Sequence, residues 1–263
     1  NGDGSAAADS NHYWNHSISN SLIQYNSGDG IGSDNYFHSL SIDNCTVTRN
    51  GWWNYGVGVW IGWDAENVSL TNSIITHNGD ENEGDDGTGV RIYRGAYNIL
   101  VDNNIIQYNQ PQYYSTDNGG GRGIGIQWFD AQATITNNTI TYNGNDDNDW
   151  DEWDNWGVKI HNNYDYGYLP VFQNNIIHSN GYYEVYCSEW QDSWFGVDMD
   201  FRNNDWGTAV NDEMTNAASH PANISVFYDR FEGDGYPLIN YACWEGADCG
   251  YTGDLSFTNA GGN

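Results

Sequence analysis

Cationic side chains are scarce in this sequence, which has 7 Lys and Arg residues against 36 Asp and Glu. Arg91 and Lys159 occupy the same place in two copies of a short Gly-Val-x-Ile motif, and His161 lies two residues after Lys159. A lyase acting on a uronate needs a cation that neutralises the carboxylate and a base that removes a proton. If the protein is an enzyme, we therefore expect Lys159, His161 and Arg91 to be catalytic. The alternative interpretation is that these cations pair with the abundant carboxylates.

Aromatic and amide side chains accompany the cations at the equivalent and following positions of the motif. They are Trp60, Trp63, Tyr93, Gln127 and Trp128. Sugar rings stack on Trp and Tyr, while polar side chains hydrogen-bond to the sugar hydroxyls. We therefore predict that these residues form a glycan-binding surface.

Two insertions between the motif copies are rich in Asp, Asn and Gly. Their candidate metal ligands are Asp147, Asp149 and Asp151 in one insertion and Asp80, Asp85 and Asp86 in the other. Carboxylate oxygens at alternating positions suit a hard cation such as Ca²⁺. The sequence thus predicts Ca²⁺ as a cofactor, although a solvated acidic loop explains the same composition. The spacing is not that of an EF-hand, because Glu152 occupies the place of the invariant glycine.

A recurring asparagine pattern shows which elements must position these residues. The first asparagine of each copy is Asn20, Asn44, Asn72, Asn103, Asn137, Asn174 or Asn203, and in all but the last copy a second asparagine follows six residues later. The copies recur every 24 to 37 residues, which is typical of a solenoid. Apolar β-branched residues two or three positions apart indicate strand, turn, strand in each copy.

The Gly-Val-x-Ile motif supplies a third strand to each repeat. It recurs before residues 62, 93, 127 and 161, with a looser copy at Gly196-Val197-Asp198-Met199. Alternation along a strand directs the first and third apolar residues inward. The inward residues are then Val59, Ile61, Val90, Ile92, Val158 and Ile160. We therefore predict an all-β parallel β-helix solenoid of about seven coils, with long loops on one edge.

The recurring asparagines have a structural rather than a catalytic interpretation. Asn tolerates the left-handed backbone conformation that a tight bend requires. Stacked in successive coils, its amide can also donate to and accept from its neighbours. We expect residues 1–16 to lead into the first coil, residues 17–208 to form the coils, and residues 209–263 to form a C-terminal capping segment.

The four cysteines bear on both the cap and the cellular compartment. Cys243 and Cys249 bracket a short loop that a disulfide could close, as suits an oxidising compartment. Cys45 either pairs with Cys187, in a later insertion, or is a buried thiol, and we favour the buried thiol. Together with 13 Trp, 20 Tyr and a single lysine, these features favour an extracellular protein, secreted or on the cell surface.

The net charge of −29 excludes several classes of partner. It argues against nucleic acid and anionic membranes, which repel a strongly acidic surface. The sequence also lacks an apolar run near 18 residues, so we expect no membrane insertion.

The closing section of the chain adds a family resemblance. Segment 201–208 reads Phe-Arg-Asn-Asn-Asp-Trp-Gly-Thr. With the asparagine repeats, it resembles the right-handed parallel β-helix superfamily, the pectate-lyase-like solenoids and secreted β-helix repeat proteins. The resemblance implies a right-handed solenoid closed by a short amphipathic segment. That superfamily includes lyases, hydrolases, epimerases and adhesins, so the resemblance implies no single activity.

Two functions are therefore expected from the sequence. The first is an extracellular structural or adhesive module, stabilised by Ca²⁺, that assembles with copies of itself into an oligomer or filament or binds a polysaccharide or cell-surface glycan. The second is a polysaccharide lyase or glycoside hydrolase acting in a groove on the Gly-Val-x-Ile sheet. The catalytic signatures of pectate and alginate lyases are absent from the sequence, which favours the first.

Overall fold

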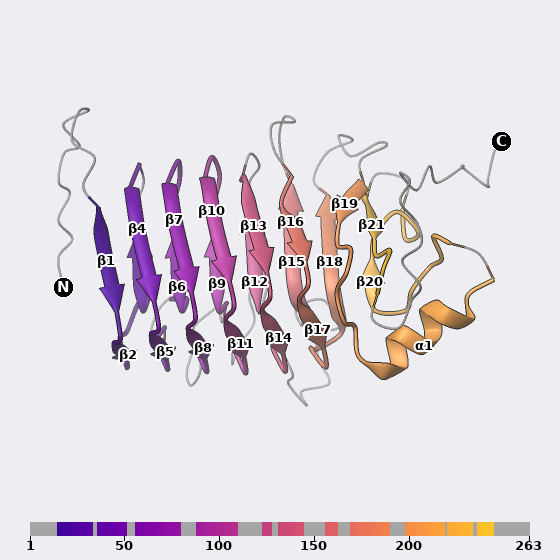
Figure 1. The fold of residues 1–263 in the computed structure, drawn as a ribbon, viewed down its shortest axis with the longest axis horizontal. Helices are drawn as coiled ribbons and strands as arrows, with labels where there is room; N and C mark the ends of the chain where they lie inside the picture. Colours follow the sequence, from indigo (N-terminus) through magenta and orange to yellow (C-terminus); the bar gives the residue numbers. More distant parts are fainter. Residues whose placement is uncertain are drawn as a thin grey trace.

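The computed structural model is a solenoid of stacked coils with three strands in each complete coil (Figure 1). It describes residues 15–33, 36–51, 56–79, 88–109, 123–127, 131–144, 156–162, 169–189, 198–218, 220–233 and 236–244. The strands form three parallel sheets of eight, six and seven strands, which we call sheets A, B and C. Each strand pairs with the equivalent strand one coil away, which confirms the predicted parallel β-helix.

The strands of the three sheets have the following bounds. Sheet A contains β1 (His16–Ser19), β4 (His38–Asp43), β7 (Glu66–Thr71), β10 (Tyr97–Asp102), β13 (Ala133–Thr136), β16 (Val171–Gln173), β19 (Asp198–Asp200) and β21 (Leu238–Asn240). Sheet B contains β2 (Leu22–Gln24), β5 (Thr46–Thr48), β8 (Ile74–Thr76), β11 (Ile105–Gln107), β14 (Thr139–Thr141) and β17 (Ile176–His178). Sheet C contains β3 (Ile31–Ser33), β6 (Val59–Ile61), β9 (Val90–Ile92), β12 (Ile124–Gln127), β15 (Trp156–Asn162), β18 (Tyr183–Glu189) and β20 (Phe227–Tyr228).

The core runs through the solenoid as columns of aliphatic side chains. All six residues predicted to face inward from the Gly-Val-x-Ile strands are 2% exposed or less. Near the C-terminal end the columns become aromatic, and the rings of Phe172 and Phe201 stack with centroids 4.4 Å apart. The helix α1 (Thr208–Asn216) lies between β19 and β20 in the chain and at the C-terminal end of the stack (Figure 1). Among the described residues, no helix is long and apolar enough to span a membrane.

One strand assignment from the sequence is wrong. Asp198 and Met199, from the looser copy of the motif, lie in β19, which pairs with β16 and β21 in sheet A. Sheet C continues instead through β18, where Val185 lies beside Val158 and Cys187 beside Ile160. Cys187 is therefore a core residue rather than part of an insertion. The error arose because β18 (Tyr183–Glu189) has Glu184 at the position where the other copies have glycine.

The first asparagine of each copy adopts the predicted left-handed conformation. From Asn20 to Asn203, all seven have φ between 50° and 61°. At the second asparagine the left-handed residue is instead the preceding one, in the series Tyr25, Arg49, His77, Tyr108, Tyr142 and Ser179. The second asparagine thus has ordinary backbone geometry, and its side chain turns into the solenoid.

The second asparagines form a ladder along the solenoid, the inner ladder, which is buried from Asn50 onward. It runs through Asn26, Asn50, Asn78, Asn109, Asn143 and Asn180. Each Nδ2 donates to the Oδ1 of the next residue at 2.8–3.0 Å. A second buried ladder is formed by the residue after each first asparagine, from Ser73 through Asn104, Asn138 and Asn175 to Asn204. These side-chain amides hydrogen-bond to one another and to backbone carbonyls, so their role is structural.

The inner ladder explains why the sheet C motif begins with glycine. A Cβ on Gly58 would lie 2.8 Å from Nδ2 of Asn78, and one on Gly89 would lie 2.7 Å from Nδ2 of Asn109. Carbon atoms do not approach an amide nitrogen this closely without displacing it. The ladder asparagine about 20 residues after each motif glycine therefore requires a residue without a Cβ at the glycine position.

Two of the cysteines are free thiols in the core. Cys45 and Cys187 are both buried, and neither is in a disulfide. The Cys45 thiol donates to the carbonyls of Asp43 and Ile18 at 3.3 and 3.5 Å. The buried-thiol interpretation of Cys45 is confirmed. Cys249 lies outside the described residues, so its disulfide with Cys243 stays a prediction.

Candidate functional site

The outer face of sheet C aligns the cations and aromatic residues in one column. Neighbours in register run from Gly32 through Trp60, Arg91, Gly125, Lys159 and Tyr186 to Tyr228. The order Trp60, Arg91, Gly125, Lys159 is the one that strand alternation predicted. The next column contains Gln127 beside His161. Gly125 divides the main column into two clusters.

The first cluster, which we call the Arg91 cluster, consists of Trp60, Trp63, Arg91, Tyr93 and Gln127. The Tyr93 ring stacks on Trp60 with centroids 5.2 Å apart and on Trp63 at 5.6 Å. The Arg91 guanidinium lies 5.0 Å from the Trp60 centroid and 5.7 Å from that of Tyr93. Its Nε donates to Oε1 of Gln127 at 2.7 Å, and Nη2 donates to the same oxygen. Cation–π contacts and a bifurcated hydrogen bond thus hold Arg91 in place.

The Arg91 cluster presents part of its surface to solvent. The Trp63 side chain is 44% exposed, whereas Gln127 is 2% exposed. Trp60, Arg91 and Tyr93 are half-buried. Four residues predicted to bind glycan are therefore brought together, with Trp63 outermost and the Gln127 amide buried against the cation. The fifth, Trp128, lies outside the described residues.

The second cluster surrounds Lys159 on the other side of Gly125. The ammonium nitrogen lies 4.1 Å from the ring centroid of Trp156 and 5.8 Å from that of Tyr186. Trp156 stacks on Tyr186, which stacks on Tyr228, each pair with centroids 4.6 Å apart. Lys159 is only 5% exposed. A buried ammonium held on an indole face is a stabilising contact within the fold.

The described contacts do not bring the three predicted catalytic residues to one reacting centre. Arg91 contacts rings on one side of Gly125 and Lys159 contacts rings on the other. His161 is placed in β15 beside Gln127, but its side chain lies outside the described part of the chain. A catalytic role for Lys159, His161 and Arg91 therefore stays a prediction.

The predicted Ca²⁺ ligands lie outside the described residues. They are Asp80, Asp85, Asp86, Asp147, Asp149 and Asp151. Within the described ranges, no group of three or more His, Cys, Asp or Glu side chains is arranged to hold a metal ion. The Ca²⁺ prediction thus concerns the two acidic insertions alone.

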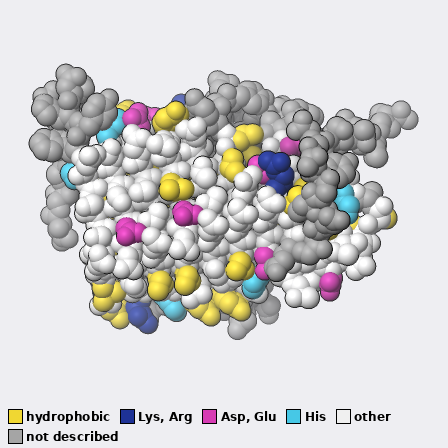
Figure 2. All heavy atoms as spheres, in the orientation of Figure 1, with side chains coloured by type: hydrophobic (Ala, Val, Ile, Leu, Met, Phe, Trp, Pro, Cys, Tyr) yellow, Lys and Arg dark blue, Asp and Glu magenta, His cyan; other side chains and the backbone are white. Residues whose placement is uncertain are grey.

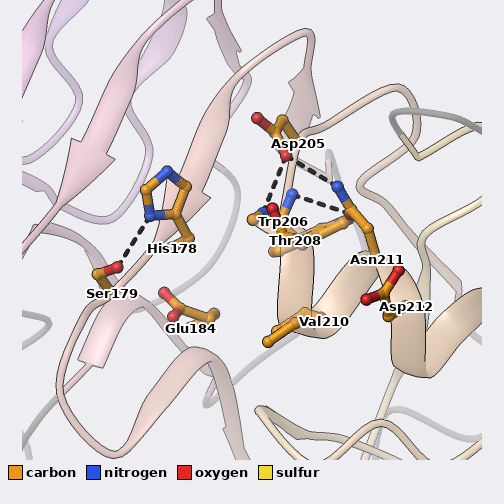
Figure 3. Close-up of a pocket in the computed structure, with 11 residues that line it drawn as sticks. His178, Ser179, Glu184, Asp205, Trp206, Thr208, Val210, Asn211 and Asp212 are labelled. Carbon is orange, nitrogen blue, oxygen red and sulfur yellow. Dashed lines mark hydrogen bonds between the residues drawn. The ribbon is translucent and has the colours of Figure 1, made fainter.

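A pocket of about 710 Å³ lies between the last coils and the start of α1 (Figure 3). Figure 3 shows His178 and Glu184 on one side of the pocket, and Asn211 and Asp212 of α1 on the other. Asp205 Oδ1 accepts from the Gly207 amide at 2.9 Å and from Asn211 Nδ2 at 3.0 Å. Asp205 thus fixes the turn from the last coil into the helix.

Glu184 ends the inner ladder at this pocket. Asn180 Nδ2 donates to Glu184 Oε2 at 2.6 Å, and the Asn180 amide donates to Oε1 at 3.3 Å. A carboxyl group thus occupies the place of the next ladder asparagine. Burial raises the pKa of Glu184 to about 7, opposed by these hydrogen bonds. Sequence reasoning missed Glu184, although Glu184-Val185-Tyr186-Cys187 aligns with the Gly-Val-x-Ile motif and has an acid in place of glycine.

Two carboxyl groups in one pocket are a requirement of glycoside hydrolases. Three carboxyl groups line this pocket, those of Glu184, Asp205 and Asp212. The described hydrogen bonds of Glu184 and Asp205 go to Asn180, Gly207 and Asn211, groups that end the ladder and start α1. We therefore assign Glu184 and Asp205 a structural role. Of the two sites, the Arg91 cluster has the composition of a binding surface.

Comparison with known proteins agrees with the architecture. A family model described as a right-handed beta helix region matches residues 1–163, more than half of the chain. Searches of curated proteins and of solved structures each gave no significant match. The match, the three parallel sheets and the stacked asparagines lead to one conclusion: the chain belongs to the right-handed β-helix family.

Proposed function

We propose that the protein is a carbohydrate-binding β-helix module that holds a polysaccharide or cell-surface glycan against the Arg91 cluster. The observation that supports the proposal is the partly exposed stack of Trp60, Trp63 and Tyr93 beside a guanidinium positioned by Gln127. Aromatic side chains accept the C–H faces of sugar rings, and guanidinium N–H groups donate to sugar oxygens. The rigid solenoid holds these groups in fixed positions, which lowers the entropy cost of binding.

The charge of the protein favours an uncharged glycan. A net charge of −29 repels a polyuronate or a sulfated chain, whereas a neutral polysaccharide meets no such barrier. An adhesive module of this kind acts outside the cell, in agreement with the predicted extracellular location. Ca²⁺ in the two acidic insertions would stiffen those loops, as part of the same proposal.

The test is a binding panel of neutral and acidic polysaccharides, read by affinity electrophoresis and by calorimetry. We expect binding to a neutral polysaccharide, weakened about tenfold or more by Trp63→Ala or Tyr93→Ala, since each removes a stacking ring. The matched control is Tyr97→Ala, because Tyr97 of sheet A is 44% exposed, as is Trp63. Equal affinity of the Trp63→Ala and Tyr97→Ala variants would contradict the proposal.

The same panel separates binding from catalysis. Unsaturated products are detected by absorbance and new reducing ends by a colorimetric assay. We expect neither product from a binding module. Product formation that is lost in Lys159→Ala would show instead that the protein is a polysaccharide-degrading enzyme acting on this face.

A further inference from the structure

Among the described strands, those of sheet B have the least charged outer face of the three sheets. All six of its strands are described, and the first and third residue of each point away from the core. None of these is Asp, Glu, Lys or Arg, and all but Thr48 and Thr141 are at least partly exposed. Sheet A differs, because its outer face carries carboxylates such as Asp43, Glu66 and Asp102. Figure 2 shows hydrophobic side chains gathered along the lower side of the molecule, where the strands of sheet B lie in Figure 1.

The first outward column of sheet B is exposed and largely aliphatic. In register it reads Leu22, Thr46, Ile74, Ile105, Thr139 and Ile176. Leu22 is 60% exposed, and the three isoleucines are 39–40% exposed. Exposed aliphatic rows of this kind are characteristic of protein–protein contacts, whereas sugar-binding faces rely on aromatic rings.

The column has the same chemical order from either end. Leu22 and Ile176 are its outer members, Thr46 and Thr139 come next, and Ile74 and Ile105 lie at the centre. A surface that meets its own copy across a twofold axis must be self-complementary in this way. The twofold axis that relates the two copies in this way runs parallel to the strands, midway between β8 and β11. The two solenoids of the dimer then run in opposite directions.

The adjoining corner of the solenoid does not repeat this order, but the same axis brings complementary side chains together there. The left-handed residues there form an external row in which Tyr108 stacks on Tyr142 at 5.3 Å and His77 stacks on Tyr108 at 5.3 Å. The proposed axis brings Arg49 of one copy to Tyr142 of the other, and His77 to Tyr108. The first pair is a cation–π contact between copies. Within one copy, Arg49 already lies 5.9 Å from the Tyr25 ring centroid.

We propose that sheet B is the interface of an antiparallel twofold dimer of this chain. Six strands at about 4.8 Å spacing and three residues at about 3.3 Å give a strip of a few hundred Å². That area is below the roughly 800 Å² per partner of a standard interface, so the dimer is concentration-dependent rather than permanent. Each chain carries a net charge of −29, so added salt strengthens the dimer by screening repulsion.

The first test is sedimentation velocity of the unmodified protein over a roughly hundredfold concentration range at low and high salt. We expect a monomer–dimer equilibrium that shifts toward dimer as salt rises. A protein that stays monomeric throughout would overturn the proposal. The measurement does not depend on glycan binding, since sheet C remains outside the interface and each monomer keeps its Arg91 cluster.

The second test uses charge substitutions at the centre of the strip. Ile105→Glu and Ile74→Lys should each weaken dimerisation at least about tenfold, because each places a charge against an isoleucine of the partner. The matched control is Leu100→Glu in sheet A of the same coil, since Leu100 is 37% and Ile105 40% exposed. Circular dichroism verifies the fold of each variant. Equal effects of Leu100→Glu and Ile105→Glu would contradict the interface.

Mixing the two interface variants tests the antiparallel register. In the proposed dimer, position 105 of one chain faces position 74 of the other. The carboxylate introduced by Ile105→Glu therefore meets the ammonium introduced by Ile74→Lys, and the mixture should form a heterodimer although each variant alone is monomeric. If the two solenoids ran in the same direction, position 105 of one chain would face position 105 of the other, and mixing the two variants would not restore dimerisation. Failure of the mixture to dimerise overturns the antiparallel geometry.

Discussion

The asparagines of each repeat look equivalent in the sequence but belong to two different environments. Asn103 lies at an exposed bend with φ of 56°, and its amide donates to Asn72 at the surface. Asn109, six residues later, is completely buried in the inner ladder. The first supports a local backbone conformation, whereas the second carries hydrogen bonds between coils. The contribution of a repeated asparagine to stability therefore depends on where its side chain lies.

The largest effect is expected from breaking the inner ladder in its middle. Asn109→Ala removes the hydrogen bonds to Asn78 at 2.9 Å and Asn143 at 3.0 Å, and leaves the Ile75 carbonyl without its amide donor. Buried polar groups without partners cost about 1–3 kcal/mol each, so we expect a loss of roughly 4 kcal/mol. Urea unfolding followed by circular dichroism measures it. A loss below about 1 kcal/mol would contradict the ladder's role.

A second effect concerns the end of the ladder, where Glu184 replaces asparagine. The pKa of Glu184 in the folded protein is about 7, above the ordinary value of 4.5. Its contribution to stability is therefore complete below pH 4.5 and is lost as the pH rises through 7. A shift of this size corresponds to roughly 3 kcal/mol.

Glu184→Gln removes this titration while keeping an amide at the ladder end. We expect the variant to lose less stability than the unmodified protein between pH 4.5 and pH 8, measured by urea unfolding at several pH values. Asp229, whose pKa is raised to about 6 by burial, titrates in both proteins and cancels from the difference. A variant that is less stable than the unmodified protein at pH 8 would show that the ladder prefers an ionised carboxylate.

The smallest effect is expected at the exposed bend. Asn103→Ala removes one surface hydrogen bond and places a residue with a Cβ at φ of 56°. The left-handed conformation costs an alanine about 1 kcal/mol, so the loss of stability should be near that value. The ratio of the Asn109→Ala and Asn103→Ala effects, measured in the same urea series, tests the comparison directly. Similar losses of stability at both positions would contradict the distinction between the buried and the exposed asparagines.

The two outer faces extend this comparison to function. Sheet C carries stacked aromatic rings and two cations, whereas the strands of sheet B carry aliphatic, hydroxyl, amide and imidazole side chains. We assign the first to glycan binding and the second to self-association, because each surface matches the chemistry of a different partner. If both proposals hold, one rigid solenoid holds two independent binding faces.

The sequence by itself determined the period, most of the strands and the inward residues of the Gly-Val-x-Ile motif. Each of these depends on local properties: alternation along a strand, the tolerance of Asn for the left-handed region, and a repeat length close to one coil. Val59 and Ile61 could be placed in the core, and Trp60 in the outward column, without a structure. Even the alignment of Trp60, Arg91, Gly125 and Lys159 follows from the repeat alone.

Only the tertiary structure decided which neighbours these residues meet. Insertions of variable length separate the copies, so the sequence could not show that β18 rather than β19 continues sheet C. It could not separate Arg91 from Lys159 into two clusters, because cation–π contacts depend on side-chain direction. The place of Glu184 in the ladder and the symmetric order of sheet B likewise emerge only when coils are stacked. Contacts between coils join residues far apart in the sequence. The repeat predicts which strand positions align, but not the direction in which each side chain points or which insertion separates two coils.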